Sequence, residues 1–127
     1  MAFQVLKKRA GFTRIAQSRV YARLSSVIVQ GDVSEAPHVG YTASRRVGSA
    51  VRRNRAKRRL RAAVLDLFRA KLLMPSDFDF VFIATSATPD IEFPILKDHI
   101  LSGVQKCTRL LEGRLPQIQT IEGDLSA

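Results

Sequence analysis

The most regular hydrophobic pattern in the chain lies between residues 50 and 73 and predicts an amphipathic helix. Ala56, Leu60, Ala63, Val64 and Leu67 recur at helical spacing, and at 100° per residue they fall within one arc of roughly 100°. A stripe of this width is typical of a helix that packs one side against a core. We therefore expect this segment to lie on a sheet or on another helix.

Both ends of this helix can be placed from the sequence. Val47-Gly48 breaks the preceding segment, and Ser49 is a candidate N-cap because its hydroxyl can accept a hydrogen bond from an unpaired amide of the first turn. The helix should end before Pro75, and Ser76-Asp77 should form the turn that follows.

Two segments before this helix have the patterns of strands. Residues 24–30 and 38–44 flank the turn-rich stretch 31–37, so we expect them to pair as neighbouring strands. The second segment alternates cleanly, with Val39, Tyr41 and Ala43 on one face and His38, Gly40 and Thr42 on the other.

After the long helix, the chain contains its most apolar run. Residues 78–86, FDFVFIATS, predict a central strand that is buried on both faces. A second amphipathic helix should begin at Phe93, with Pro94 in its first turn, and should end at Gly113. Its apolar stripe consists of Leu96, Ile100, Val104, Cys107 and Leu111.

The N-terminal region predicts one more helix, because Phe12, Ile15, Ala16 and Val20 recur at helical spacing. The order helix, strand, strand, helix, strand, helix predicts an α+β fold, an α/β sandwich in which helices back a central sheet. With 127 residues the chain has the size of one domain. We place this domain at residues 1–114 and expect residues 115–127 to form a flexible tail.

Positive charge is concentrated in the first half of the chain. Residues 1–61 hold 15 Lys and Arg against two acidic residues, residues 62–127 hold six against nine, and the formal net charge is +10. Nine of the 17 residues from Arg45 to Arg61 are Lys or Arg. This asymmetry indicates a polyanionic partner for one face, and nucleic acid is the commonest such partner.

The sequence disfavours several other classes of protein. No apolar run approaches 18 residues and no signal peptide is present, which argues against a membrane. The single cysteine, Cys107, excludes an internal disulfide and suits a reducing cytoplasm. One Cys and two isolated His do not make a zinc site, and no nucleophile–base set indicates a catalytic residue or a small-molecule substrate. Asp77 and Asp79, expected at a turn and a strand edge, are not a catalytic pair.

The cations of the long helix lie opposite its apolar stripe. Asn54, Arg58 and Arg61 fall on that side, and Lys57 flanks them. Arg can bond two phosphate oxygens at once, so the excess of Arg favours geometric contact with phosphate or base over diffuse attraction. The alternative is a solvated face without a specific partner, which the mutual repulsion of like charges on adjacent turns disfavours.

Two residues outside this helix each admit two interpretations. Phe12 is either a core residue of the first helix or, given the cations Lys7, Lys8, Arg9 and Arg14 around it, a platform on which a base stacks. Ser44 is either a hydroxyl at the end of a strand or a phosphate contact.

Residues 48–61, GSAVRRNRAKRRLR, resemble the signature of the bacterial ribonuclease P protein subunit, whose pattern is roughly GxAVxRNRxKRxxR. The preceding VGYTASRRVG is similar to the strand and loop of that family, and residues 6–9, LKKR, followed by Phe12 are similar to its opening. The resemblance extends over about residues 6–112 in element order. The residues that fit the central pattern are Gly48, Ala50, Val51, Arg53, Asn54, Arg55, Lys57, Arg58 and Arg61.

This resemblance implies a fold, partners and an activity. The family fold is an α/β sandwich with an unusual left-handed βαβ crossover through the basic helix. The implied partners are a large catalytic RNA and precursor tRNA, from which the ribonucleoprotein removes the 5′ leader. The RNA holds the metal ions, with magnesium expected, and performs the hydrolysis, so the protein needs no cofactor and is inactive in isolation.

The resemblance also implies the site residues. A cleft between the sheet and the first helix takes the single-stranded leader, and Phe12, Lys8, Arg9 and Ser44 are expected there. Ala16 stands where family members often carry a second aromatic residue, which implies a shallower cleft and weaker stacking. The expected contacts with the catalytic RNA are Arg45, Arg46, Arg52, Arg53, Asn54, Arg55, Lys57, Arg58 and Arg61.

Two other functions fit the residues. One is a plain RNA- or DNA-binding module, such as a ribosomal protein, and only the RNR motif at residues 53–55 argues against it. The other is a metal nuclease that acts alone. Carboxylates avoid the basic half, where a phosphodiester would bind, and this argues against the nuclease.

Overall fold

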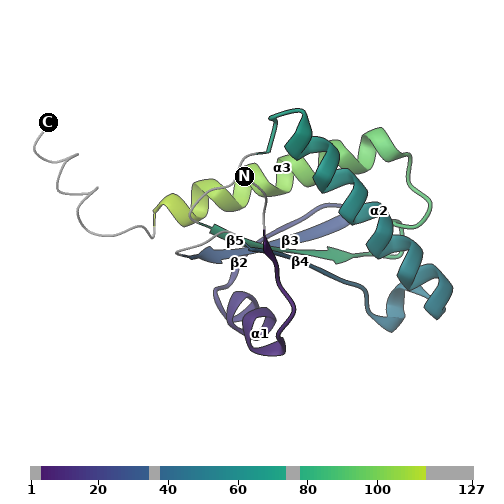
Figure 1. The fold of residues 1–127 in the computed structure, drawn as a ribbon, viewed down its shortest axis with the longest axis horizontal. Coiled ribbons are helices and arrows are strands. Elements are labelled where there is room, and N and C mark those ends of the chain that lie inside the picture. Colours follow the sequence, from purple (N-terminus) through teal and green to yellow (C-terminus); the bar gives the residue numbers. More distant parts are fainter. Residues whose placement is uncertain (1–3, 35–37, 74–77, 114–127) are drawn as a thin grey trace, which may run out of the picture.

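The computed structural model describes residues 4–34, 38–73 and 78–113. In this part of the chain three helices cover a five-stranded sheet with the strand order β1-β4-β5-β3-β2. Figure 1 shows α2 and α3 on one face of the sheet and α1 on the other, which confirms the predicted α+β sandwich. The elements are β1 (Gln4–Val5), α1 (Arg9–Gln17), β2 (Val20–Arg23), β3 (Val27–Val33), β4 (His38–Thr42), the 3-10 turn η1 (Arg45–Val47), α2 (Ala50–Arg69), β5 (Phe78–Ala84) and α3 (Phe93–Glu112).

Strand β5 occupies the centre of the sheet, as its apolar sequence predicts. It pairs antiparallel with β3 and parallel with β4, and all of its residues except Ile83 are buried. The expected pairing of residues 24–30 with 38–44 is therefore wrong, because β5 lies between β3 and β4. The most apolar strand loses the most surface to water where it has a neighbour on each edge and a helix on each face.

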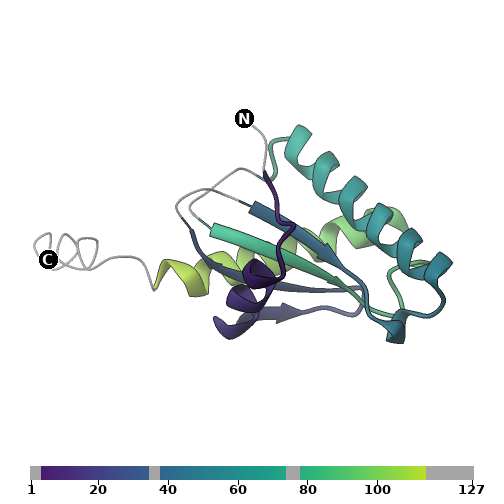
Figure 2. The same cartoon turned by 60° about the horizontal axis from the view of Figure 1, so that its bottom comes forward.

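The connection from β4 through α2 to β5 joins two adjacent parallel strands. It is left-handed, as the resemblance implies, whereas most such crossovers are right-handed (Figure 2). The crossover places α2 along the β4 side of the sheet, beside α3. The basic helix therefore packs on the fold through its buried stripe, from Ala56 to Leu67, and is not an isolated arm.

The N-terminal helix is shorter than the pattern predicts. It ends at Gln17, and Val20 begins β2, a strand that the sequence analysis missed together with the two-residue β1. Arg19 has a positive φ of 61°, and this turn reverses the chain into the sheet. Ile15 is fully buried, as its place in the helical pattern predicts. Ala16 belongs to the same predicted pattern but is exposed.

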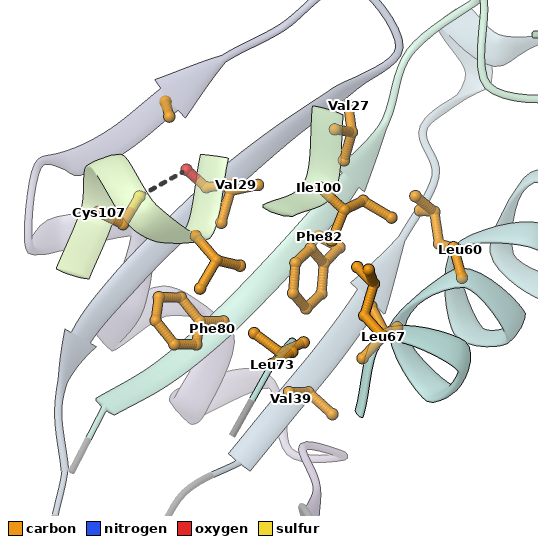
Figure 3. Packing of buried hydrophobic residues seen from close by; sticks show 14 of the residues in the cluster. Val27, Val29, Val39, Leu60, Leu67, Leu73, Phe80, Phe82, Ile100 and Cys107 are labelled. Carbon is orange, nitrogen blue, oxygen red and sulfur yellow. Dashed lines mark hydrogen bonds between the residues drawn. The ribbon is translucent and has the colours of Figure 1, made fainter. Parts of the chain in front are cut away.

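The main hydrophobic core lies between the sheet and the pair α2 and α3. Phe82 of β5 lies at its centre, with Ile100 of α3 and Leu60 of α2 nearby (Figure 3). Cys107 is fully buried, its Sγ donates to the carbonyl oxygen of Val29 at 3.4 Å, and burial raises the pKa of its thiol to about 12. The predicted apolar stripes of both long helices are confirmed as core.

An ionic cluster joins α1 to the opposite face of the sheet. Asp79, expected at a strand edge, is instead buried inside β5 and forms an ion pair with Arg14 of α1. Its Oδ1 also lies 3.1 Å from Nδ1 of His38 in β4. It also accepts from the backbone amide of His38 at 2.8 Å, and Arg14 pairs with Asp32 of β3 at 2.7 Å. A buried carboxylate needs such partners to offset its desolvation, so these contacts fix α1 on the sheet. Asp77 lies outside the described residues.

Candidate nucleic-acid interface

The segment before α2 is shaped by hydroxyl caps and one glycine. The Ser44 hydroxyl accepts from the amide of Arg46 in η1, and the Ser49 hydroxyl accepts from the amide of Arg52, which confirms Ser49 as the N-cap of α2. Gly48 between them has a φ of 131°, a backbone conformation that residues with a side chain rarely adopt. The chain therefore turns sharply where the basic helix begins.

Two rows of residues in the first part of α2 lie on either side of the buried stripe. The loop flank, Arg52, Arg55 and Arg59, faces the loop of residues 85–91 between β5 and α3. The solvent flank borders an open depression of about 480 Å³ and consists of Val51, Asn54, Lys57, Arg58 and Arg61. The two rows follow from the helical period, because residues three and four apart lie on the same side.

The loop flank is bound to the protein itself. Its arginines donate to acceptors of the loop. The loop is in turn held by the segment just before β3, since the Thr88 hydroxyl donates to the carbonyl oxygen of Ser26 at 2.7 Å. The contacts are Arg52 Nη2 to Asp90 Oδ2 at 2.9 Å, Arg55 Nε to the Pro89 carbonyl at 2.7 Å, Arg59 Nη1 to the Thr88 carbonyl at 2.6 Å, and Arg59 Nη2 to the Ile91 carbonyl.

Two pKa shifts reflect this arrangement. The hydrogen bond from Arg52 lowers the pKa of Asp90, and the charges of Arg52, Arg55 and Arg59 act in the same direction. Burial, followed by repulsion from Arg55, lowers the pKa of Arg59. The loop flank is thus a set of cations whose acceptors come from the protein, and Arg59 among them is partly desolvated.

The solvent flank has a different environment. Asn54, Arg58 and Arg61 are exposed, and Lys57 is partly buried. Among the described residues, the side chains of Asn54, Lys57 and Arg58 have no hydrogen-bond or ion-pair partner. The Arg61 guanidinium lies 5.3 Å from the ring centroid of Tyr41, within cation–π range. Three cations and an amide thus face an open depression, the arrangement of donors that binds phosphates and base edges.

The nine predicted RNA contacts therefore fall into three groups. Four of them, Asn54, Lys57, Arg58 and Arg61, come together on the solvent flank. Arg45 and Arg46 are exposed in η1, just before the helix. The remaining three, Arg52, Arg53 and Arg55, donate to protein acceptors, Arg53 through Nη1 to the Gly48 carbonyl at 2.9 Å.

The face of the sheet that carries α1 is only partly covered. Phe12 of α1 is partly buried and lies directly on Gly40 of β4, where an added Cβ would come within 2.7 Å of its ring. Beyond α1, the strand register places Ile28, Ile83 and Thr42 in one row, and all three are only partly buried.

None of these three residues was predicted to line the cleft, although the alternation in residues 38–44 placed Thr42 on the face of Gly40. The predicted cleft residues Lys8 and Arg9 are exposed at the start of α1, and Ser44 is exposed beyond β4.

The part of the chain that the structure describes contains neither a candidate metal site nor a candidate membrane-spanning helix. No group of three or more His, Cys, Asp or Glu side chains in residues 4–34, 38–73 and 78–113 could hold a metal ion. Among the same residues, no helix combines the length and apolar character that crossing a bilayer requires.

Comparisons with known proteins agree on one family. The family model described as Ribonuclease P matches residues 2–108. The ribonuclease P protein component of Paramagnetospirillum magneticum is 33% identical over 108 residues, which cover 80% of this chain and 80% of that protein. The corresponding protein of Ruegeria pomeroyi is 38% identical over 112 residues, which cover 80% of this chain and 84% of that protein.

Solved structures show the same fold. The RNase P protein of Staphylococcus aureus aligns with a TM-score of 0.64 and 21% identity, covering 83% of this chain and 94% of that one. The RNase P protein of Thermotoga maritima aligns with a TM-score of 0.60 and 23% identity, covering 89% of this chain and 98% of that one. The predicted resemblance is confirmed, and the chain belongs to the ribonuclease P protein family.

Proposed function

We propose that this chain is the protein subunit of a ribonuclease P ribonucleoprotein in the cytoplasm. It binds the catalytic RNA through the solvent flank of α2 and binds the 5′ leader of precursor tRNA along the α1 face of the sheet. Membership of the family supports a role in an RNA-processing ribonucleoprotein. The observation that carries the RNA contact is the solvent flank, where Asn54, Lys57 and Arg58 have no partner among the described residues.

In this proposal the RNA performs the hydrolysis and holds the divalent metal ions, with magnesium expected. The solvent flank offers cations and one amide, which position phosphates, and these groups do not act as general bases at neutral pH. The protein contributes binding energy, and it directs that energy to a segment that the mature product lacks. The isolated chain is therefore expected to cleave no precursor tRNA at any metal concentration.

The leader site is proposed on the α1 face. Phe12 offers part of a ring, the row of Ile28, Thr42 and Ile83 offers a partly exposed floor, and the nearby Lys8, Arg9 and Ser44 can contact phosphates. Single strands bind proteins through this combination of cations for the backbone and apolar or aromatic groups for the bases. Because Ala16 leaves one position of α1 without a ring, we expect stacking to be weak.

A pair of binding constants tests the proposal. The RNA subunit, with and without protein, is titrated with precursor tRNA and with mature tRNA. The protein should tighten binding of the precursor far more than binding of the mature form. Phe12→Ala should remove part of the difference, near the low end of about 1–3 kcal/mol for one stacked base, while leaving affinity for the RNA subunit nearly intact. Equal tightening of both tRNAs would overturn the leader site and leave an RNA-binding module.

A further inference from the structure

A second hollow lies beside the solvent flank, and it is apolar. It is a groove of about 200 Å³ between the second half of α2 and the edge of the sheet at β1 and β4, lined by Val5, Tyr41, Val64, Leu65 and Phe68 together with Arg61. Val5 is 51% exposed and Leu65 is 44% exposed. Large apolar side chains left open to water next to a cationic surface suggest that the groove has an occupant.

The groove continues the solvent flank along α2. Asn54, Arg58, Arg61, Leu65 and Phe68 follow one another at intervals of four, three, four and three residues, so they form one line on the helix. Arg61 borders both the open depression and the apolar groove. An RNA strand whose phosphates lie along the first half of this line of residues therefore reaches the groove at Arg61.

The chemistry of the groove suits a nucleobase. The guanidinium carbon of Arg61 lies 5.3 Å from the centre of the Tyr41 ring, and both groups are flat. Aliphatic side chains and Phe68 form the remaining walls. Aromatic rings, guanidinium planes and apolar walls are the groups on which unpaired RNA bases stack. A second copy of this chain is a poorer occupant, because it would bring another cationic surface with a formal net charge of +10.

We propose that this groove takes one unpaired base of the RNA that lies on the solvent flank. The inference rests on the proposed function, since it assumes that the flank binds the catalytic RNA. The groove would add a contact that does not depend on charge to a surface that otherwise recognises phosphates. Binding would then depend on an unstacked nucleotide at one place in the RNA.

The test compares two exposed leucines. Leu65→Ser removes a wall of the groove, and Leu110→Ser removes a leucine of similar exposure, 48%, on α3. Leu65→Ser should weaken binding of the catalytic RNA by about 5- to 150-fold, the range for one stacked base, with an unchanged log–log salt slope. Leu110→Ser should leave affinity within about twofold, because it removes no contact with the RNA. Thermal melting of both variants shows whether each remains folded.

A crosslink locates the base directly. Leu65→p-benzoylphenylalanine should crosslink to one unpaired nucleotide of the catalytic RNA, mapped by primer extension, and Leu110→p-benzoylphenylalanine should not crosslink. Crosslinks spread over paired regions would overturn the inference. The inference would also be overturned if the wild-type protein sedimented as a dimer and Leu65→Ser sedimented as a monomer, because the occupant of the groove would then be a second copy.

The failure of this inference can be told apart from the failure of the proposed function. If the wild-type protein binds the catalytic RNA no better than an unrelated RNA, the proposed function falls. If the wild-type protein binds specifically but Leu65→Ser behaves like Leu110→Ser, only the groove is wrong.

Discussion

The two flanks of α2 each carry three cations, but these cations lie in opposite environments. Arg58 and Arg59 are neighbours in the sequence, yet Arg59 donates to two carbonyl groups of the loop while Arg58 faces the open depression without a partner among the described residues. The difference is the presence of protein acceptors. A dense run of cations therefore contains two kinds of residue, and only their place on the helix distinguishes them.

The comparison also shows how so much positive charge is accommodated. Like charges on adjacent turns repel and destabilise a helix. On the loop flank, backbone carbonyls and the Asp90 carboxylate offset this repulsion. On the solvent flank the repulsion remains until an anion arrives, so the flank gains more from binding a polyanion than a neutral helix would.

Removal of the solvent flank should have the largest effect on RNA binding. In the triple variant Lys57→Ala, Arg58→Ala, Arg61→Ala, affinity for the catalytic RNA should fall at least about 100-fold, because each hydrogen bond to a charged group contributes about 1.5–3 kcal/mol. The slope of log affinity against log salt, expected near −4 for about six contacts, should flatten by about 2 units. Filter binding over a fourfold range of salt measures both. A wild-type slope shallower than about −1 would contradict the role of this flank.

The loop flank should control stability instead. Arg59→Ala leaves two carbonyl groups of the loop without a donor, and we expect it to lower the free energy of unfolding by about 1.5–3 kcal/mol. Chemical denaturation measures this loss, with Arg58→Ala as the control that should cost little. RNA affinity of the folded Arg59→Ala protein should keep the wild-type salt slope. A flattened slope would show that Arg59 also contacts phosphate and would remove the distinction between the flanks.

Substitution by lysine tests whether the solvent flank acts through geometry or through charge alone. Arg58→Lys keeps the charge but loses the planar fork, and it should cost about 1–3 kcal/mol of RNA affinity if the contact is bidentate. The matched change Arg59→Lys should leave RNA affinity unchanged and lower stability. Equal RNA affinity for the wild type and Arg58→Lys would mean that only net charge matters.

Alkaline pH should weaken the fold through Tyr41 and Cys107. Burial raises the pKa of Tyr41 to about 12 from its usual 10 and that of Cys107 to about 12 from 9. The contributions of these two protonated side chains to the free energy of unfolding are fully present below about pH 9. As the pH rises towards 12, the unfolded chain loses protons that the folded chain keeps, so stability falls. Urea denaturation between pH 8 and 11 should show this fall, and a smaller fall in Tyr41→Phe and Cys107→Ala. An identical pH dependence in all three proteins would contradict it.

The smallest expected effect is that of Asn54. This side chain is exposed between the cations of the solvent flank and carries no charge. Asn54→Ala should weaken RNA binding by about 0.5–1.5 kcal/mol, the contribution of one neutral hydrogen bond, without changing the salt slope. Unchanged affinity would mean that Asn54 only separates the cations.

The sequence was sufficient for features that depend on local pattern. The stripes of α2 and α3, the N-cap Ser49 and the buried strand β5 all follow from spacing within one segment. The gathering of Asn54, Lys57, Arg58 and Arg61 on one side also follows from the helical period. These features need no knowledge of what the segment packs against.

Features that depend on distant partners were not predictable in the same way. The pairing of β3 and β4 was wrong because β5, which separates them, comes about 40 residues later in the chain. Arg52 and Arg55 of the loop flank were predicted as RNA contacts, and nothing local reveals that their protein acceptors, Asp90 and the Pro89 carbonyl, lie against this side of the helix. Asp79 was misplaced for the same reason, since its partners Arg14 and His38 are far away in the sequence.

The position of β5 also has a consequence for how the protein is made. Because β3 and β4 meet only through β5, the sheet cannot assemble until residue 84 has left the ribosome. By then the strongly cationic segment 1–61 has been synthesised, and its self-repulsion opposes compaction. Folding thus depends on non-local pairing, which is slow, and a polyanion that binds only the folded form shifts the equilibrium towards it. Synthesis without its RNA should therefore leave more of the newborn chain exposed to proteases.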